Sequence, residues 1–340
     1  MIIILKSGHT QSQLDEVKLI VEKHQCEPIL IKGTFKTTVN VLGDDTQIDA
    51  DLFRQLAGVE EVIRIAAPYR LASRTFKKED TTINIKGVTY GPGHFVIMGG
   101  PCAVESEDQT YRIARAVKKA GANVLRGGAY KPRTSPYAFQ GMGEDGLKIL
   151  RAVSDETGLP VITEALDSKS LEMVYKYGDI IQIGTRNMQN FSLLKEVSKL
   201  DKPVMIKRGM SSTIDEWLLA AEYVLAGGNH QVMLCERGIR SFDARYTRNV
   251  IDLGAVPVAK ALSHLPVVVD PSHGSGRKEN VIPMSLASLA VGANSILVDV
   301  HDDATKALCD GPQALTPPEF EGLVKKLHRV ASALDIKIKG

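Results

Sequence analysis

The stretch Phe95-Val96-Ile97-Met98-Gly99-Gly100-Pro101-Cys102 is an uninterrupted apolar run that ends in small and polar residues. Strands that are buried on both faces have this continuous apolar character. Seven similar runs follow along the chain, separated by spacers long enough for helices. The eight runs are Phe95–Gly99, Val124–Arg126, Pro160–Ala165, Ile180–Ile183, Pro203–Lys207, Gln231–Cys235, Pro266–Asp270 and Ser295–Val300. This pattern predicts an α/β protein with a parallel (β/α)8 barrel, or TIM barrel, over residues 81–340, close to the roughly 250 residues typical of that fold.

A doubly wound open sheet is the competing architecture for such a pattern. It is less favoured because no G-x-G-x-x-G motif follows the first run. Polar or ionisable residues also follow all eight runs, as expected where the carboxyl ends of barrel strands build an active site.

Residues 1–66 have a different organisation and predict a small ferredoxin-like, or ACT-like, α+β domain. Its expected strands and helices, in chain order, are Ile2–Lys6, Gln11–His24 (helix), Ile29–Ile31, Thr37–Val41, Asp51–Ala57 (helix) and Val62–Ile65. The segment contains no catalytic constellation and no glycine-rich phosphate loop. We therefore interpret it as a binding or regulatory domain, with a purely structural cap as an equal alternative.

Two short segments join the predicted domains. Residues 67–80 are charged and rich in turn formers, and we expect them to form a linker. Thr82–Gly91 then predicts a short hairpin that turns at Lys86-Gly87.

The composition is that of a globular enzyme or binding protein. Of the 340 residues, 44% are hydrophobic and 24% are charged, and the formal net charge is only +2. A charge near zero gives no overall attraction to nucleic acid or to an anionic membrane, so any anion site must be local. The apolar start Ile2–Leu5 is too short for a secretory signal, and no run of eighteen uncharged apolar residues occurs. Four scattered cysteines without a CxxC pair favour a reducing cytoplasm.

Basic residues dominate the positions that follow the strands. They are Arg126, Lys131, Arg133, Arg186, Lys207 and Arg237. Cations that converge on one mouth repel each other, and the usual reason to retain them is an anionic ligand. The set predicts either two phosphorylated substrates or one phosphate and a carboxylate beside a second phosphate. The alternative, pairing with barrel carboxylates such as Glu164 or Glu236, accounts for one or two of the six at most.

A second group of candidate residues comprises Cys102, His273, Asp299 and Asp310. One thiolate, one imidazole and two carboxylates suit a borderline divalent metal such as manganese, iron, cobalt or zinc. A free cysteine or a lone histidine is by itself more often structural. Four such residues at one barrel mouth, beside an anion site, favour a metal site. His264 and His301 are nearby alternatives, whereas Cys235 and Cys309 are interpreted as structural.

The segments Gly99–Cys102, Lys131-Pro132-Arg133-Thr134-Ser135, Ile183–Asn187 and Asp270–His273 resemble those of 3-deoxy-D-arabino-heptulosonate 7-phosphate (DAHP) synthases, type I beta subgroup. The resemblance covers residues 80–340, and the leading module resembles the ferredoxin-like extension of some members. It implies a transferase that joins phosphoenolpyruvate to D-erythrose 4-phosphate, releases phosphate and opens the shikimate route to aromatic amino acids. It further implies a homotetramer and feedback inhibition by tyrosine or phenylalanine.

The resemblance also implies roles for individual residues. The phosphoenolpyruvate contacts would be Arg126, Lys131, Arg186, Lys207 and Arg237, and the erythrose 4-phosphate contacts Arg133, Thr134 and Ser135. Cys102, His273, Asp299 and Asp310 match the metal ligands, although the third ligand is usually glutamate and is here the shorter Asp299. Glu164 with Lys207 would activate the water, and Lys131 or Asp310 would handle the aldehyde proton.

Three other functions are consistent with parts of the pattern. A 3-deoxy-octulosonate 8-phosphate synthase, which uses arabinose 5-phosphate, shares the barrel but usually carries a Lys-Ala-Asn-Arg-Ser segment where this chain has Lys131–Ser135. A class I aldolase would form a Schiff base on Lys131 or Lys207 and would survive a chelator. A phospho-sugar-binding regulator with an inactive barrel would lack metal ligands.

Overall fold

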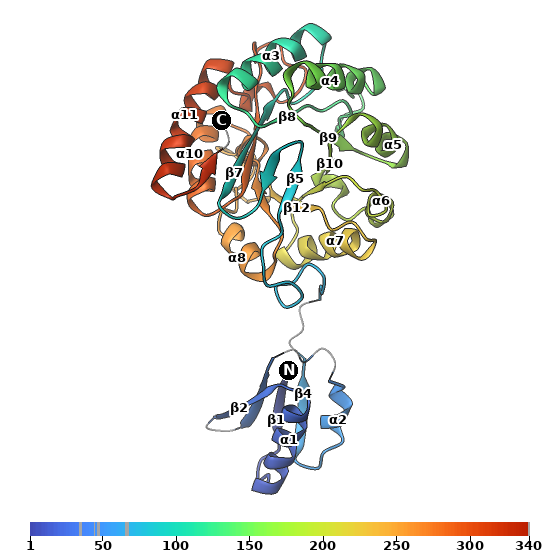
Figure 1. The fold of residues 1–340 in the computed structure, drawn as a ribbon, viewed down its shortest axis with the longest axis vertical. Coiled ribbons are helices and arrows are strands. Elements are labelled where there is room, and N and C mark those ends of the chain that lie inside the picture. Colours follow the sequence, from blue (N-terminus) through green and yellow to red (C-terminus); the bar gives the residue numbers. More distant parts are fainter. Residues whose placement is uncertain (34–35, 44, 46–47, 65–67, 339–340) are drawn as a thin grey trace. The chain divides into compact units, whose positions relative to one another are not determined.

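The computed structural model describes residues 1–33, 36–43, 45, 48–64 and 68–338. The chain divides into two compact units, Met1–Tyr69 and Arg70–Gly340 (Figure 1). Each unit is described by itself.

The N-terminal unit is a four-stranded antiparallel sheet with two helices. Its elements are β1 (Ile2–Leu5), α1 (Gln11–Lys23), β2 (Glu27–Lys32), β3 (Thr37–Leu42), α2 (Ala50–Arg54) and β4 (Val59–Ile63). The strand order is β2-β3-β1-β4, and Ile3, Val17 and Phe53 are fully buried between sheet and helices. The predicted ferredoxin-like arrangement is confirmed. Ile65, Ala66 and Ala67, where we expected the last strand and the domain to end and the linker to begin, lie outside the described residues.

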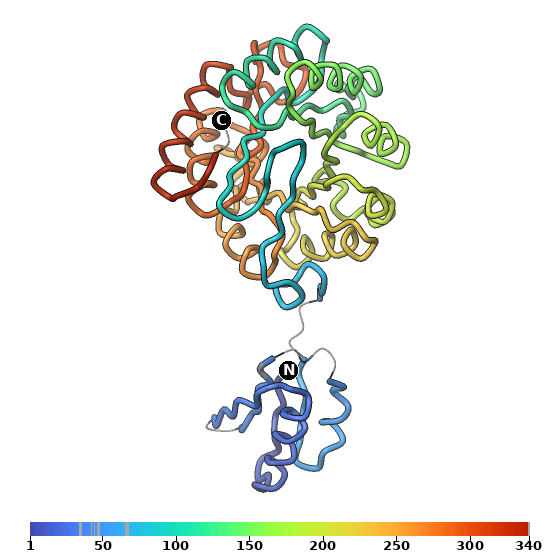
Figure 2. The backbone as a smooth tube through the Cα atoms, viewed as in Figure 1, coloured from blue at the N-terminus to red at the C-terminus, as the bar shows by residue number. Residues whose placement is uncertain are grey.

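The second unit is the predicted (β/α)8 barrel. Its strands are β7 (His94–Gly100), β8 (Val124–Arg126), β9 (Val161–Ala165), β10 (Ile180–Ile183), β11 (Val204–Lys207), β12 (Val232–Glu236), β13 (Val267–Val269) and β14 (Ser295–Asp299). Neighbours pair in parallel in chain order, and β14 pairs with β7 to close the sheet. The chain therefore winds once around the barrel in sequence order (Figure 2).

Helices form the outer ring of this unit (Figure 1). They are α3 (Glu107–Ala120), α4 (Glu144–Thr157), α5 (Ser168–Tyr177), α6 (Phe191–Val197), α7 (Ile214–Ala226), α8 (Ala255–Leu262), α10 (Lys278–Ala290) and α11 (Pro317–Ala333). Three short elements lie in the loops after the strands instead, namely the 3-10 turn η1 (Thr185–Asn187), the helix α9 (Pro271–Ser275) and the 3-10 turn η2 (Gly311–Gln313). Helix α3 shows how the sequence sets their limits. The Ser106 side chain caps its start, and Gly121, at φ 102°, ends it in the left-handed conformation that favours glycine. A final short strand, β15 (Lys337–Ile338), pairs with β7.

A hairpin covers the amino end of the barrel. Strands β5 (Ile83–Ile85) and β6 (Val88–Tyr90) pair antiparallel and turn at Lys86 and Gly87, which both have positive φ, as a two-residue type I′ turn requires. The predicted hairpin is therefore confirmed. Its apolar side chains join the core cluster inside the barrel, and Lys86 Nζ lies 2.8 Å from a carboxylate oxygen of Asp179, which directly precedes β10.

The segment before the hairpin lies against the barrel. Ala72 N donates to Glu222 Oε2 at 2.8 Å, and Arg74 Nε donates to the Lys260 carbonyl at 3.0 Å. The residues from Arg70 to Asp80, which we expected in a linker, thus belong to the barrel unit.

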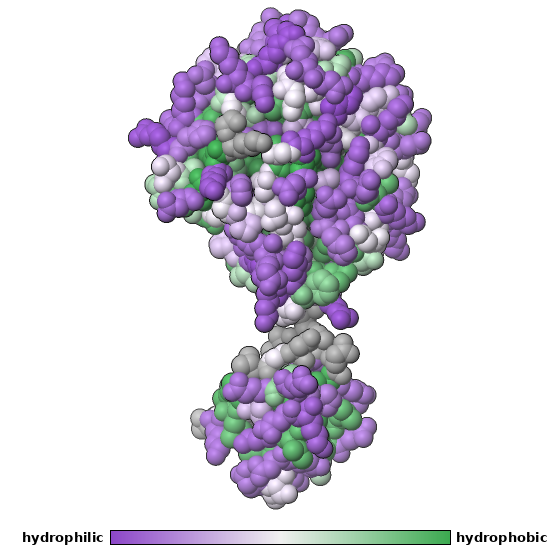
Figure 3. Space-filling model, in the orientation of Figure 1, coloured by the Kyte–Doolittle hydropathy of each residue, from purple (hydrophilic) through white to green (hydrophobic). Residues whose placement is uncertain are grey.

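Hydrophilic side chains dominate the face seen in Figure 3. Among the described residues, no helix combines the length and the apolar character needed to cross a bilayer.

Candidate active site at the carboxyl end of the barrel

A cavity of about 640 Å³ opens where the strands end. Among the described residues, eight lysine and arginine side chains line it against two carboxylates, Glu164 and Asp310. The basic residues are the six predicted ones together with Arg240 and Arg248. Thr134 and Ser135 also line the cavity, whereas Cys102 and Asp299 are buried and do not. Such an excess of positive charge in a protein of nearly zero net charge makes the cavity an anion site.

Two of the six predicted cations have buried carboxylate partners. Arg126 Nη1 lies 2.6 Å from Asp299 Oδ1, and Lys207 Nζ lies 2.5 Å from Asp270 Oδ2. Burial opposes the charge of Arg126, but Asp299, Cys102 and Asp270 together outweigh this effect and raise the pKa of the guanidinium. The structure thus agrees with our expectation that one or two cations pair with barrel carboxylates, although the partners are neither Glu164 nor Glu236.

The remaining cations lack carboxylate partners. Among the described residues, no carboxylate oxygen lies within 4 Å of Lys131, Arg133, Arg186 or Arg237. Arg237 is the clearest case, because its Nη1 atom is buried without a hydrogen-bond partner in the described part of the chain. Burial lowers the pKa of this guanidinium. An anion bound in the cavity would give Arg237 Nη1 a hydrogen-bond partner and would offset the free-energy cost of burying its charge.

Lys131 lies deep in the cavity beside Cys102. Its Nζ donates to the Cys102 carbonyl at 2.9 Å and to the Cys102 Sγ at 3.1 Å. Gly128 permits this approach, because a Cβ there would lie 2.6 Å from the same carbonyl oxygen. Burial works against the charge, but the Cys102 and Cys309 sulfurs raise the pKa of Lys131, so the ammonium keeps its proton.

Glu164 stands at the end of β9, where a glycine makes room for it. Gln182 Nε2 donates to Glu164 Oε2 at 3.0 Å. A Cβ at Gly184 would lie 1.8 Å from Glu164 Oε1, so any larger residue there would displace the carboxylate. The carboxylate therefore keeps a defined position on the cavity wall, close to the end of β10.

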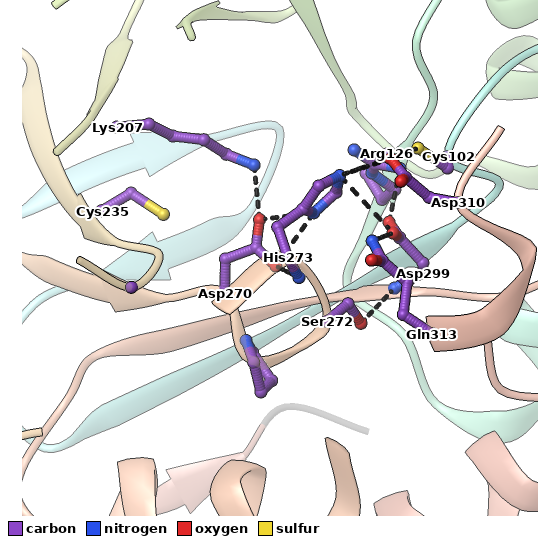
Figure 4. Close-up of polar contacts among 12 residues, drawn as sticks. Cys102, Arg126, Lys207, Cys235, Asp270, Ser272, His273, Asp299, Asp310 and Gln313 are labelled. Atoms are coloured by element: carbon purple, nitrogen blue, oxygen red, sulfur yellow. Dashed lines mark hydrogen bonds and ion pairs between the residues drawn. The ribbon is translucent and has the colours of Figure 1, made fainter. Parts of the chain in front are cut away.

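His273 is oriented by Asp270, a residue that the sequence analysis did not single out. The ring Nδ1 lies 3.1 Å from Asp270 Oδ1 (Figure 4), while Lys207 binds the other oxygen. Burial disfavours both charges, but their attraction holds the pKa of Asp270 well below its usual range and raises the pKa of His273 to about 9. With Nδ1 bound to a carboxylate, Nε2 is left to face a metal ion.

The four predicted metal ligands come together around this Nε2 atom (Figure 4). It lies 3.7 Å from Cys102 Sγ and 3.6 Å from carboxylate oxygens of both Asp299 and Asp310. Ligand atoms held 2.0–2.3 Å from one ion are separated by about 3–4 Å, so the donor set fits a divalent metal. Asp310 has φ 52°, a left-handed conformation that aspartate tolerates better than most residues.

Comparison with known proteins identifies the family. The sequence pattern of the DAHP synthetase I family matches residues 75–335, and that of the DAHP synthase ferredoxin-like domain matches residues 1–67. The chain is 47% identical over 338 residues to the phospho-2-dehydro-3-deoxyheptonate aldolase of Thermotoga maritima, covering 99% of this chain and 100% of that protein. The chain belongs to the DAHP synthetase I family. The predicted resemblance is confirmed.

Solved structures and other relatives agree with membership of the DAHP synthetase I family. The crystal structure of the Thermotoga maritima DAHP synthase matches with a TM-score of 0.80 and 46% identity over 99% of both chains. A truncated form of the Thermotoga maritima enzyme matches 79% of this chain and 98% of its own, with a TM-score of 0.74 and 47% identity. A 2-dehydro-3-deoxyphosphooctonate aldolase of Syntrophotalea carbinolica is 32% identical and covers 76% of this chain and 98% of its own.

The sequence analysis was wrong about the position of Cys309, which lies at the candidate metal site. We interpreted it as structural, yet its Sγ lies 3.5 Å from the Cys102 Sγ, and Arg133 Nη1 donates to it. The hydrogen bond from Cys102 lowers the pKa of Cys309 and raises the pKa of Cys102. The adjacent Asp310 was the signal that could have placed Cys309 at the site. Cys235 fits the structural interpretation, because it is buried in the barrel interior.

Proposed function

We propose that this chain condenses phosphoenolpyruvate with D-erythrose 4-phosphate and water to give DAHP and inorganic phosphate. Family membership and 47% identity over 99% of the chain confirm the predicted activity of a DAHP synthase. The observation that carries the assignment of residues is the cation-lined cavity next to the metal-ligating cluster.

Phosphoenolpyruvate binds among five of the cations that line the cavity. Arg186, Arg237 and Lys131 line the cavity without carboxylate partners among the described residues, and Arg126 and Lys207 line it beside them. Arginine forks suit the planar carboxylate and the phosphate, which both accept paired hydrogen bonds. The five residues together match a ligand that carries both groups.

Erythrose 4-phosphate binds nearer the rim. Arg133, Thr134 and Ser135 line this part of the cavity, and Arg186 Nη2 donates to Thr134 Oγ1 at 3.3 Å. Two hydroxyls and one guanidinium are a set that suits a phosphate. We expect the aldehyde end of the sugar to point toward the candidate metal ligands Cys102, His273 and Asp310.

Cys102, His273, Asp299 and Asp310 would hold a divalent ion such as Mn²⁺, Fe²⁺, Co²⁺ or Zn²⁺. When bound there, the ion supplies a Lewis acid for the aldehyde oxygen. Asp270 keeps the His273 ring in place for this role.

Proton transfers fall to side chains on the cavity wall. Carbon 3 of phosphoenolpyruvate bonds to the aldehyde carbon, and water adds to carbon 2. The bond between carbon 2 and the phosphate oxygen then breaks, the carbon 2 hydroxyl becomes the keto group, and its proton leaves with the inorganic phosphate. Lys131 donates a proton to the new alkoxide, with Asp310 as the alternative donor, because the raised pKa of Lys131 keeps it protonated. Glu164, assisted by Lys207, accepts the proton of the attacking water.

The test is the release of phosphate from phosphoenolpyruvate with and without erythrose 4-phosphate, before and after a strong chelator. We expect release only with the aldehyde and only before chelation. Equal or faster turnover with arabinose 5-phosphate would instead favour the octulosonate reaction, which the relatives at 30–32% identity are named for. Activity that survives the chelator and is trapped by borohydride would indicate a Schiff-base aldolase.

The N-terminal unit is proposed to carry feedback control. The ferredoxin-like domain pattern matches residues 1–67 and supports a regulatory module, with tyrosine or phenylalanine as the effector. Deletion of residues 1–66 is expected to retain turnover and to abolish inhibition by the aromatic amino acid. A truncated enzyme that keeps both would make the module structural.

The proposal also covers the oligomeric state and the cellular compartment of the enzyme. We expect a homotetramer, which light scattering on the full chain would test. The buried Cys102, Cys235 and Cys309 are free thiols, which supports a reducing, cytoplasmic location.

A further inference from the structure

We propose that Cys309 is a ligand of the same metal ion as Cys102, so that the site contains two thiolates. The proposal rests on the metal site of the proposed function and adds a residue to it. It also specifies the class of metal, since two thiolates favour Zn²⁺, Co²⁺ or Fe²⁺ over Mn²⁺.

The first observation is the geometry around Asp310. Cys309 Sγ lies 3.5 Å from Cys102 Sγ and 3.5 Å from Asp310 Oδ2, and Cys102 Sγ lies 3.3 Å from the same oxygen. In a tetrahedral site with metal–sulfur bonds of about 2.3 Å and metal–oxygen bonds of about 2.0 Å, ligand atoms are separated by about 3.5–3.8 Å. The three observed separations lie within about 0.3 Å of these values, so the three side chains are close enough to share one ion.

The second observation concerns the position of Cys309 relative to His273. The described residues form two candidate ligand sets, Cys102 with His273 and Asp299, and Cys102 with Cys309 and Asp310. His273 Nε2 also lies 3.6 Å from Asp310 Oδ2. Cys309 and His273 thus each lie within 3.5–3.7 Å of both Cys102 Sγ and Asp310 Oδ2.

The third observation is that Asp299 is held by other partners. Arg126 Nη1 lies 2.6 Å from its Oδ1, and Gln313 Nε2 donates to its Oδ2 at 2.7 Å. Aspartate is also one methylene shorter than the glutamate that the family resemblance implies at this position. A carboxylate that is short and already engaged is a weak ligand, and the second sulfur compensates for it.

The competing explanation is that Cys309 only accepts a hydrogen bond from Arg133 and orients it at the cavity rim. In that case, replacement by serine, which also accepts a hydrogen bond, would leave metal binding unchanged. Cys309→Ser therefore separates the two explanations.

The experiment uses the full chain, freed of metal by a chelator under reducing conditions and then loaded with Co²⁺. Sulfur-to-cobalt charge-transfer absorption in the near ultraviolet scales with the number of thiolates bound. We expect Cys309→Ser to lose about half of this absorption and about 10- to 100-fold in Zn²⁺ affinity, with a change in Mn²⁺ affinity of less than about threefold. Cys235→Ala, at a buried cysteine outside the site, is the matched control and is expected to match the wild type.

A measurement on the wild-type protein makes the test independent of how the variant folds. X-ray absorption of the zinc-loaded chain is expected to show two sulfur ligands. A single sulfur ligand, or unchanged charge-transfer absorption in Cys309→Ser, overturns the proposal while leaving the metal site of the proposed function intact. No Co²⁺ binding by the wild-type chain overturns both.

Discussion

The two ends of the barrel are built from opposite kinds of side chain. At the amino end, the β5–β6 hairpin adds Ile83, Ile85 and Val88 to the apolar core. At the carboxyl end, eight basic side chains surround a cavity and buried charges pair beneath it. Apolar burial lowers the free energy of the folded state, whereas gathered charges raise it unless a ligand is bound. Stability and chemistry are therefore separable in this fold, and substitutions at one end should leave the function of the other unchanged.

The largest effect is expected for Lys131→Met. Removal of the buried ammonium takes away the proposed proton donor, and kcat should fall by about 10³-fold, or about 4 kcal/mol in the barrier. The free energy of unfolding should change by less than about 1 kcal/mol, because methionine fills the same space. Steady-state kinetics and the fluorescence of Trp217, the single tryptophan, measure the two quantities.

Lys325→Met, on the outer helix α11, is the control and should behave as wild type. Near-normal turnover of Lys131→Met would remove the general-acid assignment. A collapse of its stability would mean that the carboxyl end also holds the barrel together.

The second-largest effect is a loss of stability, which we expect for Ile83→Ala at the amino end of the barrel. This side chain is 2% exposed, and its truncation leaves a cavity between the hairpin and the barrel, which should cost about 3 kcal/mol of unfolding free energy. Denaturant titration measures the loss. The kcat, measured well below the transition, should not change.

Val258→Ala, at a surface position that is 44% exposed, provides the comparison and should cost less than about 0.5 kcal/mol. If Ile83→Ala lowered kcat while the protein remained folded, the two ends would be coupled and the division between them would be wrong.

A smaller effect is expected for Arg237→Met. Since Arg237 Nη1 is buried without a partner among the described residues, the phosphate or carboxylate of the substrate should supply one. Loss of that charged hydrogen bond should raise the KM for phosphoenolpyruvate by about 10- to 100-fold, or about 2 kcal/mol. Without ligand, the variant should be no less stable than wild type, because a buried unpaired charge is removed.

Inorganic phosphate offers a second measurement, since it should raise the Tm of the wild type more than that of Arg237→Met. Arg115→Met, whose guanidinium pairs with Glu156 on the outer surface, is the matched control. An unchanged KM would show that Arg237 does not contact the substrate.

The sequence predicted those features of the fold that depend on residues close together in the chain. The strands and the Lys86-Gly87 turn follow from local patterns, and the structure confirms them. The residues after each strand were predictable because the barrel brings all eight strand ends together. Arg240 and Arg248 were missed because they lie on the long loop after β12, where no periodic pattern marks them.

The sequence placed distant residues at the same end of the barrel, but it did not show which individual side chains contact each other. Cys102 and Cys309 are 207 residues apart in the chain, and nothing local indicates that their sulfur atoms meet. The partner of Lys207 was likewise unforeseen, because Asp270 lies 63 residues away on another strand end. A single sequence shows which side chains can do chemistry, while the closed sheet decides which of them come into contact.

The smallest effect is expected for Tyr90→Phe. This substitution tests whether the amino end of the barrel is stabilised by apolar contacts alone, in contrast to the charged carboxyl end. The Tyr90 hydroxyl is buried without a hydrogen-bond partner among the described residues, and burial raises its pKa. Removing this unpaired polar atom while keeping the ring should raise the unfolding free energy by about 1 kcal/mol. The expected gain in Tm is about 2–4 °C, with unchanged kcat. Tyr137→Phe, at a residue that is 97% exposed, should change neither quantity. A loss of stability in Tyr90→Phe would mean that the hydroxyl has a partner, and that the hairpin end contains a polar contact on which the fold depends.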